Sequence, residues 1–260
     1  MSDRKLSIEE LRGIALPLLE EARQIALEPK ELEVKTKTDR NDLVTQVDSS
    51  IEEFLARELF RLTGYPMLGE EEHEPESLAG RVWILDPIDG TMNYVATHRD
   101  YAISLALAED GIPVLGIVVD VTKNLFYVAQ KGKGVFCNEE RIEPVPTDSE
   151  YQDAVLITDI KEICALPRLK EALLSSRGHR RYGSAALELV EVACSRAGAF
   201  VHLWVSPWDI AAASLLCEEA GCKVTSLTGT NLDVKQKGSI LAGWPGVHSS
   251  LFKRLVQDPR

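Results

Sequence analysis

The chain has 260 residues, of which 45% are hydrophobic and 27% charged, as expected for a soluble globular protein with one large domain or two close lobes. Its 41 acidic and 29 basic residues give a net charge of −12, which disfavours general nucleic-acid binding because the field repels a phosphate backbone. No apolar run is long enough to span a bilayer, and the N-terminal segment MSDRKLSIEE is polar, so we expect a cytoplasmic protein that does not bind membranes.

The first half of the chain predicts two helices followed by an antiparallel sheet. Apolar residues at helical spacing predict a helix over 7–27, in which Pro17 indicates a kink or a late start. Residues 28–44 are polar and favour a loop or hairpin, and a serine-capped helix is expected over 49–63, ended by Gly64. Strands joined by hairpins are expected at 81–85, 101–110, 112–120 and 124–130.

The second half alternates strands with helices, which predicts a smaller α/β layer. The stretch 131–150 is rich first in glycine and then in proline, so it is the expected boundary between lobes. Residues 1–145 would form an N-terminal α+β lobe and residues 146–260 a C-terminal α/β lobe of one compact unit. Strands are expected at 154–159, 199–205, 222–227 and 239–244, and helices at 164–176, 184–198 and 207–221.

The stretch WILDPIDGTMNYV places two carboxylates where a buried strand ends. Pro87 restricts Asp86 to an extended conformation, and Asp89, Gly90 and Thr91 can begin a helix whose free N–H groups attract an anion. Two carboxylates would repel that anion unless they hold cations that the anion bridges. The stretch is therefore typical either of metal ligands beside a phosphate cradle or of an acidic turn capped by aspartate, and alone it leaves both interpretations open.

Acidic residues also lie at three further junctions between predicted elements. Glu70 and Glu71 end a short strand-like run, Asp48 precedes the second predicted helix, and Asp209 lies in the first turn of a later one. A helix cap explains Asp48 alone, and a favourable helix-dipole acid explains Asp209 alone. Considered together with the first stretch, they indicate a site for a hard cation such as Mg²⁺, which prefers oxygen ligands and leaves positions open for phosphate.

The segments LGEEE, WILDPIDGTMNYV and WVSPWDIAAASLLCEEAG resemble the three signatures of the inositol monophosphatase family of Mg²⁺-dependent, lithium-sensitive phosphatases. RNDLVTQVD and RRYGSAALELV match further family segments, so the resemblance covers roughly residues 36–221. It implies an α+β and α/β layered fold, the αβαβα sandwich of the sugar-phosphatase type, with the antiparallel sheet in the N-terminal lobe. It also implies a homodimer and two or three Mg²⁺ ions per active site, with Mn²⁺ able to substitute.

The resemblance also implies metal ligands. Glu70, Asp86 and the carbonyl of Ile88 would hold the first ion, and Asp86, Asp89 and Asp209 would hold the second. Water held near Asp209 would protonate the leaving group.

Further roles concern the attacking water and the substrate. Asp48 and Glu70 would be associated with that water and with a third ion, and Glu70 or a Thr91–Asp48 pair would accept its proton. Lys37 matches a lysine that the family carries on a mobile loop, although an ordinary solvated lysine explains it equally well. Substrate contacts are expected from Asp89, Gly90, Thr91, Ser184, Ala185, Arg180, His202 and Asp209.

Two departures from the family pattern bear on the substrate. His202 stands where animal members carry a glutamate that contacts an inositol hydroxyl, so it is either structural or a changed contact. The segment RGHRRYGS gathers basic residues from Arg177 to Arg181 in an acidic chain. It is either a solvated connection or a place where Arg180 or a neighbour meets a second anionic group, as in a bisphosphate sugar or NADP.

The expected function is hydrolysis of a small phosphorylated polyol or sugar, inositol 1-phosphate first, by metal-activated water. NADP(H) and fructose 1,6-bisphosphate are close alternatives as substrates. A non-catalytic regulatory protein that binds divalent ions is the alternative from another class, and the completeness of the acidic set disfavours it.

Overall fold

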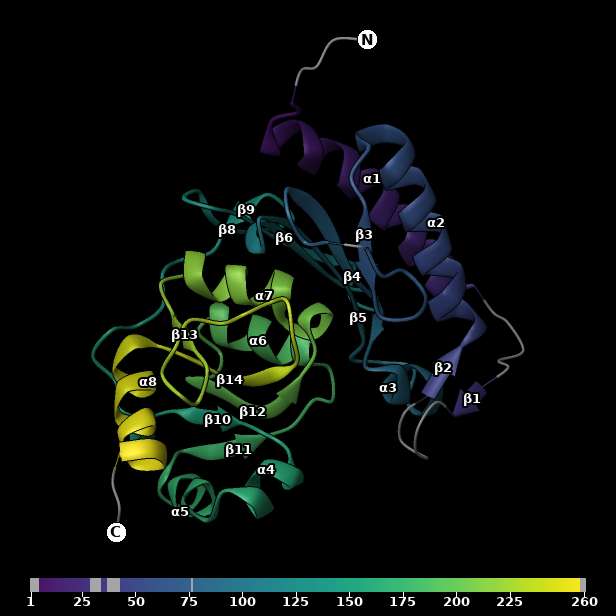
Figure 1. Cartoon of the computed structure of the whole chain (residues 1–260). Helices are drawn as coiled ribbons and strands as arrows, with labels where there is room; N and C mark the ends of the chain where they lie inside the picture. Colours follow the sequence, from purple (N-terminus) through teal and green to yellow (C-terminus); the bar gives the residue numbers. More distant parts are fainter. Residues whose placement is uncertain (1–4, 29–33, 37–42, 76, 258–260) are drawn as a thin grey trace.

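The computed structural model describes residues 5–28, 34–36, 43–75 and 77–257, and its elements stack as helices, sheet, helices, sheet and helices (Figure 1). This arrangement confirms the expected αβαβα sandwich. None of the described helices is long and apolar enough to cross a membrane.

The first outer layer consists of α1 (Ile8–Leu27) and α2 (Gln46–Thr63), which pack on one face of the larger sheet. Pro17 lies inside α1 without ending it. A short hairpin, β1 (Val34–Thr36) and β2 (Leu43–Thr45), precedes α2. The predicted start of this second helix was wrong, because Thr45 rather than a serine caps it and Asp48 closes the capping box from inside the first turn.

The larger sheet has seven strands in the spatial order β3-β4-β5-β6-β7-β8-β9, parallel between β3 and β4 and antiparallel elsewhere. Its last strands, β8 and β9, lie within 131–150, and the proline-rich segment after Arg141 connects the two sheets. The strands are β3 (Met67–Gly69), β4 (Arg81–Asp89), β5 (Ala102–Glu109), β6 (Ile112–Asp120), β7 (Leu125–Gln130), β8 (Gly134–Cys137) and β9 (Glu140–Arg141).

The middle layer is formed by α6 (Ala185–Ala193) and α7 (Pro207–Glu219), which lie between the two sheets (Figure 1). Both helices share one apolar core with Ile84 of β4 and with Phe200 of the second sheet. Burial on nearly every side explains why the α7 sequence is apolar almost all round rather than along one stripe.

The smaller sheet has the order β11-β10-β12-β14-β13 and is covered on its outer face by α4, α5 and α8. The helix expected over 164–176 is in fact two helices, because Pro167 lacks an N–H and begins α5 as a separate helix. The sequence did not predict β11 or α8, whereas the helix expected to begin at residues 89–91 is present as α3. The remaining elements are α3 (Thr91–Ala96), α4 (Ile160–Ala165), α5 (Pro167–Ser175), α8 (Pro245–Phe252), β10 (Val155–Ile157), β11 (Gly178–Arg180), β12 (Ala199–Val205), β13 (Lys223–Thr225), β14 (Gly238–Gly243), a 3₁₀ turn (Tyr151–Asp153) and a π-helical turn (Lys253–Gln257).

Candidate functional site

The end of β4 carries two buried aspartates on a bulged stretch of strand. Asp86 pairs with Ser104 of β5 and Asp89 pairs with Ala102, so β4 uses one more residue than its partner over this interval. Pro87 lies inside the bulge, where its missing N–H breaks no ladder bond. Asp86 is 2% exposed and Asp89 is 7% exposed, so the bulge directs two carboxylates into the protein.

Asp89 joins the end of β4 to the start of α6. Its carboxylate accepts hydrogen bonds from the Ser184 hydroxyl at 2.6 Å, from the Ala185 N–H at 3.2 Å and from the Ala186 N–H at 2.6 Å. Ser184 and Ala185 were expected to line a substrate pocket, and here they contact Asp89. The N-terminus of α6 is thus tied to the acidic stretch.

Gly90 connects these aspartates to α3 at a close approach between two segments. Its φ of 96° is left-handed, and a Cβ atom there would lie 3.1 Å from the carbonyl oxygen of Gly183. Both facts favour glycine at this position. In the described part of the chain no side chain caps the start of α3, so its first N–H groups are available to an anion.

Thr91 lies between Asp48 and the carbonyl of Ile88. Its hydroxyl donates to the Ile88 oxygen at 3.1 Å and lies 3.5 Å from Asp48 Oδ1. Asp48 is fully buried, and its other carboxylate oxygen accepts the N–H of Thr45 at 3.0 Å. Residues from α2, β4 and α3 therefore meet at this point.

Asp209 and Glu70 approach the same place from two other elements. Asp209 lies in the first turn of α7, half-buried, and accepts the Ser206 N–H at 2.7 Å. Glu70 follows β3 and is half-buried. Burial and then the negative charge of Asp89, with a smaller effect of Glu70, raise the pKa of Asp209 to about 8, although Lys237 partly offsets this.

The pKa values of the other carboxylates show that these elements converge. Burial raises the pKa of Asp86 well above its usual range, and Glu70, Asp89 and Asp209 then raise it further. Burial also raises the pKa of Asp48 and of Asp89, each to about 6. Side chains from four segments of the chain therefore lie within electrostatic range of one another.

This donor set fits a hard divalent cation for two reasons. Every side-chain ligand in it is a carboxylate, and these negative charges repel one another in the absence of a cation. In the described residues, however, no three His, Cys, Asp or Glu side chains already form a set that could hold a metal ion. Asp89 and Asp209 turn oxygens toward N–H groups of α6 and α7. Binding an ion here would thus require some of the carboxylates to turn toward it.

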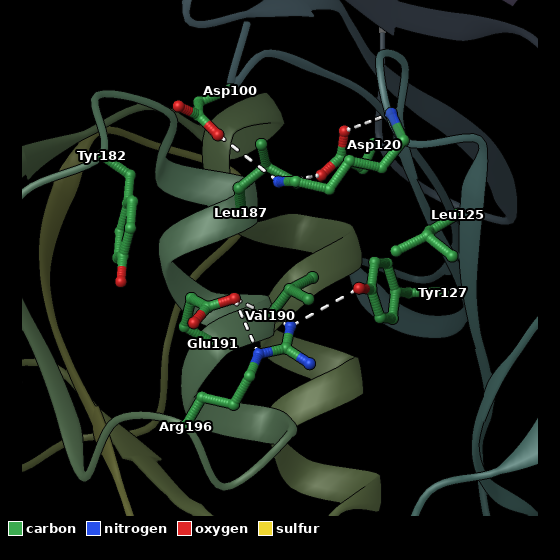
Figure 2. A pocket seen from close by; sticks show the side chains of 10 residues that line it. Asp100, Asp120, Leu125, Tyr127, Tyr182, Leu187, Val190, Glu191 and Arg196 are labelled. Atoms are coloured by element: carbon green, nitrogen blue, oxygen red, sulfur yellow. Dashed lines mark hydrogen bonds and ion pairs between the residues drawn. The ribbon is translucent and has the colours of Figure 1, made fainter.

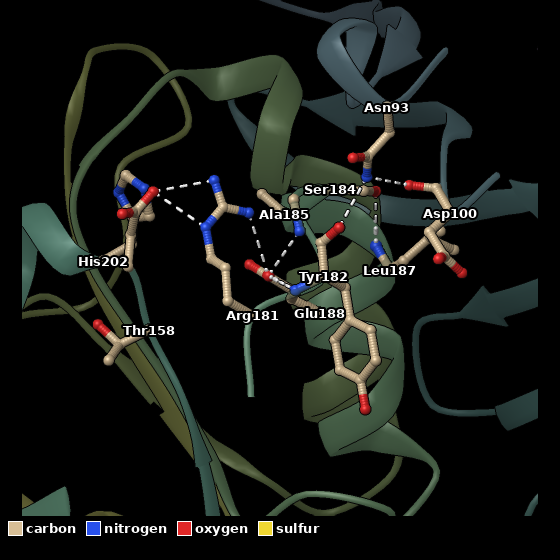
Figure 3. A network of polar contacts seen from close by, with 12 residues as sticks. Asn93, Asp100, Thr158, Arg181, Tyr182, Ser184, Ala185, Leu187, Glu188 and His202 are labelled. Atoms are coloured by element: carbon tan, nitrogen blue, oxygen red, sulfur yellow. Dashed lines mark hydrogen bonds and ion pairs between the residues drawn. The ribbon is translucent and has the colours of Figure 1, made fainter. Parts of the chain in front are cut away.

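A second polar cluster, which we call the Arg181 cluster, consists of Arg181, Asp159 and Glu188. Figure 3 shows Arg181 and Glu188 near Ser184 and Ala185, the two residues that contact Asp89. Arg181 contacts Asp159 Oδ2 at 2.9 Å and Glu188 Oε1 at 3.3 Å. Glu188 Oε1 also accepts the N–H groups of Tyr182 at 2.5 Å and Gly183 at 2.9 Å. Sequence reasoning missed this cluster, although a glutamate on the apolar face of α6 was a signal for it.

Arg180 and His202, both expected to touch substrate, lie in different surroundings. Arg180 is exposed at the end of β11, and its guanidinium donates to the carbonyl of His179 at 2.8 Å. His202 is half-buried on β12, where its Nδ1 lies 3.3 Å from the buried carboxylate of Glu162. Burial lowers the pKa of His202. Lys37 lies outside the described residues.

A cavity of about 380 Å³ adjoins the Arg181 cluster, on the side of Tyr182 and Leu187 (Figure 2). Its other lining residues are Asp100, Asp120, Lys123, Leu125, Tyr127, Val190, Glu191 and Arg196, none of them a carboxylate of the β4 site. Asn93 of α3 donates to the carbonyl oxygens of Asp100 at 2.8 Å and Tyr182 at 2.7 Å, two residues that line this cavity. We place the candidate chemistry at the β4 site, which comprises Asp86, Asp89 and the nearby carboxylates of Asp48, Glu70 and Asp209, because several of its carboxylates combine burial with mutual repulsion.

The model of the inositol monophosphatase family matches residues 4–259 of the chain. An inositol-1-monophosphatase of Bacillus subtilis (strain 168) is 36% identical over 233 residues, which cover 86% of this chain and 88% of that protein. A protein named putative Nus factor SuhB, from Neisseria meningitidis serogroup B, is 34% identical over 228 residues, covering 84% and 87%.

Solved structures agree over almost the whole length. Inositol-monophosphate-bound SaIMPase-II has a TM-score of 0.86 at 30% identity and covers 95% of this chain and 94% of its own. An IMPase/NADP phosphatase complexed with Mg²⁺ and phosphate has a TM-score of 0.88 at 28% identity, covering 96% and 97%. A Staphylococcal inositol monophosphatase-1 in a LiCl-soaked inhibitory complex has a TM-score of 0.89 at 27% identity, covering 99% and 98%.

Proposed function

The chain belongs to the inositol monophosphatase family and is a phosphoric monoester hydrolase, and we propose that it cleaves a small phosphorylated polyol, inositol 1-phosphate first, with the help of divalent cations. One observation carries this proposal. The buried Asp86 has Glu70, Asp89 and Asp209 as the neighbours that most raise its pKa, and a cation would relieve this repulsion.

The proposed ion is Mg²⁺, with two or three per site and Mn²⁺ as a substitute. Glu70, Asp86 and the Ile88 carbonyl would hold one ion, and Asp86, Asp89 and Asp209 the other. The related IMPase/NADP phosphatase that was crystallised with Mg²⁺ and phosphate supports this choice. When bound, such ions supply a more acidic water and neutralise charge on the phosphate and on the leaving alkoxide.

The chain's own residues would position the phosphate and move the proton. The N–H groups of Gly90 and Thr91 begin α3 without a side-chain cap among the described residues, so they would orient the phosphate oxygens. Asp48 would accept a proton from the attacking water through the hydroxyl of Thr91, which lies 3.5 Å from it. Glu70 is the alternative acceptor.

Inositol 1-phosphate ranks first because the Bacillus subtilis relative at 36% identity is named for that activity. NADP(H) ranks next because a related structure is an IMPase/NADP phosphatase, and fructose 1,6-bisphosphate follows. Ser184, Ala185 and His202 would shape the sugar side of the pocket. The exposed guanidinium of Arg180, which donates to the carbonyl of His179, would meet the second anionic group of the larger substrates.

A regulatory role beside hydrolysis is the second proposal, because one relative of similar identity is named a putative Nus factor. The test is phosphate release from inositol 1-phosphate, NADP and fructose 1,6-bisphosphate with Mg²⁺, with Mn²⁺ and with excess EDTA, reading kcat/KM for each. We expect release that EDTA abolishes and that Asp89→Asn reduces strongly. Release unaffected by EDTA, or none on any ester at any metal concentration, would refute the metal-dependent hydrolase.

We propose three further properties: inhibition by lithium, a cytoplasmic location and a homodimeric assembly. We propose lithium inhibition, since a related structure is a LiCl-soaked inhibitory complex. We also propose a cytoplasmic homodimer. Inhibition curves with LiCl and the mass in solution from light scattering test the first property and the assembly, and cell fractionation tests the location.

A further inference from the structure

The short acidic segment that carries Glu70 is held by another glutamate that the proposed mechanism does not use. Glu52 lies on α2, beside β3 (Figure 1), and is 1% exposed. Its Oε2 accepts the N–H of Glu71 at 2.9 Å. Its Oε1 accepts the N–H of Glu72 at 2.8 Å and that of His73 at 3.0 Å.

His73 completes these contacts. Its Nδ1 lies 2.8 Å from Glu52 Oε1, and its carbonyl oxygen accepts the N–H of Gly69 at 2.7 Å, which closes the base of the segment. A single buried carboxylate thus binds three consecutive backbone N–H groups and one imidazole. Such charge-assisted bonds are stronger than neutral ones, so they can fix a loop that has no regular structure of its own.

The surroundings of Glu52 are unfavourable for a buried negative charge. The segment already contains Glu70, Glu71 and Glu72, so a further buried negative charge beside it adds repulsion. The Glu52 carboxylate instead fixes the backbone path of the residues that follow Glu70, because its two oxygens bind their N–H groups. Glu70 is in turn one of the charges that act on Asp86.

Gly69 gives independent support from the opposite side. A Cβ atom at Gly69 would lie 2.4 Å from Glu52 Cδ and 2.5 Å from each of its carboxylate oxygens. The φ angle of Gly69 lies outside the left-handed region, so its backbone conformation does not itself demand glycine. The glycine is required because the carboxylate passes directly over it.

We propose that Glu52, packed over Gly69 and paired with His73, is a positioning residue that sets the place of the Glu70 carboxylate and thereby the affinity of the site for divalent cations. This inference rests on the proposed function, in which Glu70 is a metal ligand. Partners that orient a metal ligand typically contribute about 10-fold to 100-fold in metal affinity.

The main test compares Glu52→Gln with Glu53→Gln, the same chemical change at an exposed neighbour on α2. Calorimetric titration with Mg²⁺ alone should show affinity about 10-fold to 100-fold weaker for Glu52→Gln and unchanged for Glu53→Gln. Hydrogen exchange at the amides of residues 71–73 should become faster only in Glu52→Gln. At saturating Mg²⁺ the KM for inositol 1-phosphate should change little, because Glu52 touches no substrate.

A destabilised control separates positioning from general loss of stability. Leu55→Ala opens a cavity in the buried face of the same helix and should lower the Tm without weakening Mg²⁺ binding. Gly69→Ala should reproduce the effect of Glu52→Gln. In a Glu52→Ala background, where the carboxylate is gone, Gly69→Ala should weaken Mg²⁺ binding much less than it does in the unmodified protein.

Mg²⁺ affinity and exchange rates in Glu52→Gln within twofold of those in Glu53→Gln would overturn the inference. Equal weakening of Mg²⁺ binding by Leu55→Ala at a matched Tm would also overturn it. If the unmodified protein bound no Mg²⁺, the proposed function would fail instead. Exchange at residues 71–73 would still report whether Glu52 holds the segment.

Discussion

Two neighbouring acidic clusters in this molecule differ in how their charge is balanced. In the Arg181 cluster a guanidinium contacts both Asp159 and Glu188, and Glu188 also accepts two backbone N–H groups. In the β4 site the side chains that act most strongly on Asp86 are all negative. The clusters adjoin, since Asp89 binds the first residues of the helix that carries Glu188.

The difference in charge balance indicates which of the two acidic clusters is functional. A buried charge that is paired within the protein fixes a local structure, as the Arg181 cluster fixes residues 181–183. Buried carboxylates that repel one another cost free energy, and a protein retains them where a ligand such as a cation restores the balance. The β4 site is of this second kind.

The largest effect is expected from Asp86→Asn, which keeps the shape of the side chain and removes its charge. Because Asp86 would contact both ions, we expect kcat/KM for inositol 1-phosphate to fall by about a thousandfold or more, equivalent to about 4 kcal/mol. Phosphate release at saturating Mg²⁺ measures it. A loss below about tenfold would remove Asp86 from the proposed chemistry.

The next effect concerns the balanced cluster. Arg181→Ala leaves Glu188, which is 2% exposed, without its guanidinium partner. After allowance for the partial exposure of Arg181, we expect a stability loss of about 1–3 kcal/mol. Urea unfolding measures this, with Arg181→Lys as the variant that keeps the charge. In Arg181→Ala, kcat/KM should fall less than tenfold. A fall as large as that in Asp86→Asn would contradict the assignment of a structural role to the Arg181 cluster.

A smaller, pH-dependent effect tests the repulsion itself in the absence of metal. The pKa of Asp209 is raised from 3.8 to about 8 in the folded chain, so its contribution to stability is present below 3.8 and is lost as the pH rises toward 8. In EDTA the Tm of the unmodified protein should therefore fall between pH 5 and pH 8.

Asp209→Asn should remove much of this fall, because an amide cannot ionise but can still accept the Ser206 N–H. We expect the variant to melt a few degrees above the unmodified protein at pH 8, and the two to converge near pH 5. Asp148→Asn, at an exposed position, is the control and should track the unmodified protein. A Tm that stays flat or rises with pH in EDTA contradicts the electrostatic account.

The smallest effect is expected from Arg180→Ala, which lies outside both clusters. An exposed charge contributes little unless a ligand pairs with it, so kcat/KM for inositol 1-phosphate should change less than twofold. The kcat/KM for NADP should fall by about threefold to tenfold if Arg180 contacts the second anionic group of this substrate. Equal losses on both substrates would reject that role.

Hydrophobic periods predicted most helices and strands, and the acidic residues at their junctions indicated a cation site, because these are local signals. The layered arrangement of the elements was implied by the family resemblance. The sequence pattern misplaced the start of α2, since Thr45 competes with serines as a cap, and it merged two helices across Pro167. It also missed the Arg181 cluster, because the pairing of Arg181 with Asp159 depends on contact between separate strands and loops. Non-local partners of this kind carry no periodic signal.

The most direct test of the central claim is a crystal soaked with Mn²⁺ and measured at a wavelength where manganese scatters anomalously. We predict anomalous peaks within coordination distance, about 2.0–2.2 Å, of oxygens from Asp86, Asp89 and Asp209, with those side chains turned toward the ion. A map without a peak among these carboxylates, from crystals of protein that hydrolyses phosphate esters in the same Mn²⁺ solution, would contradict the account.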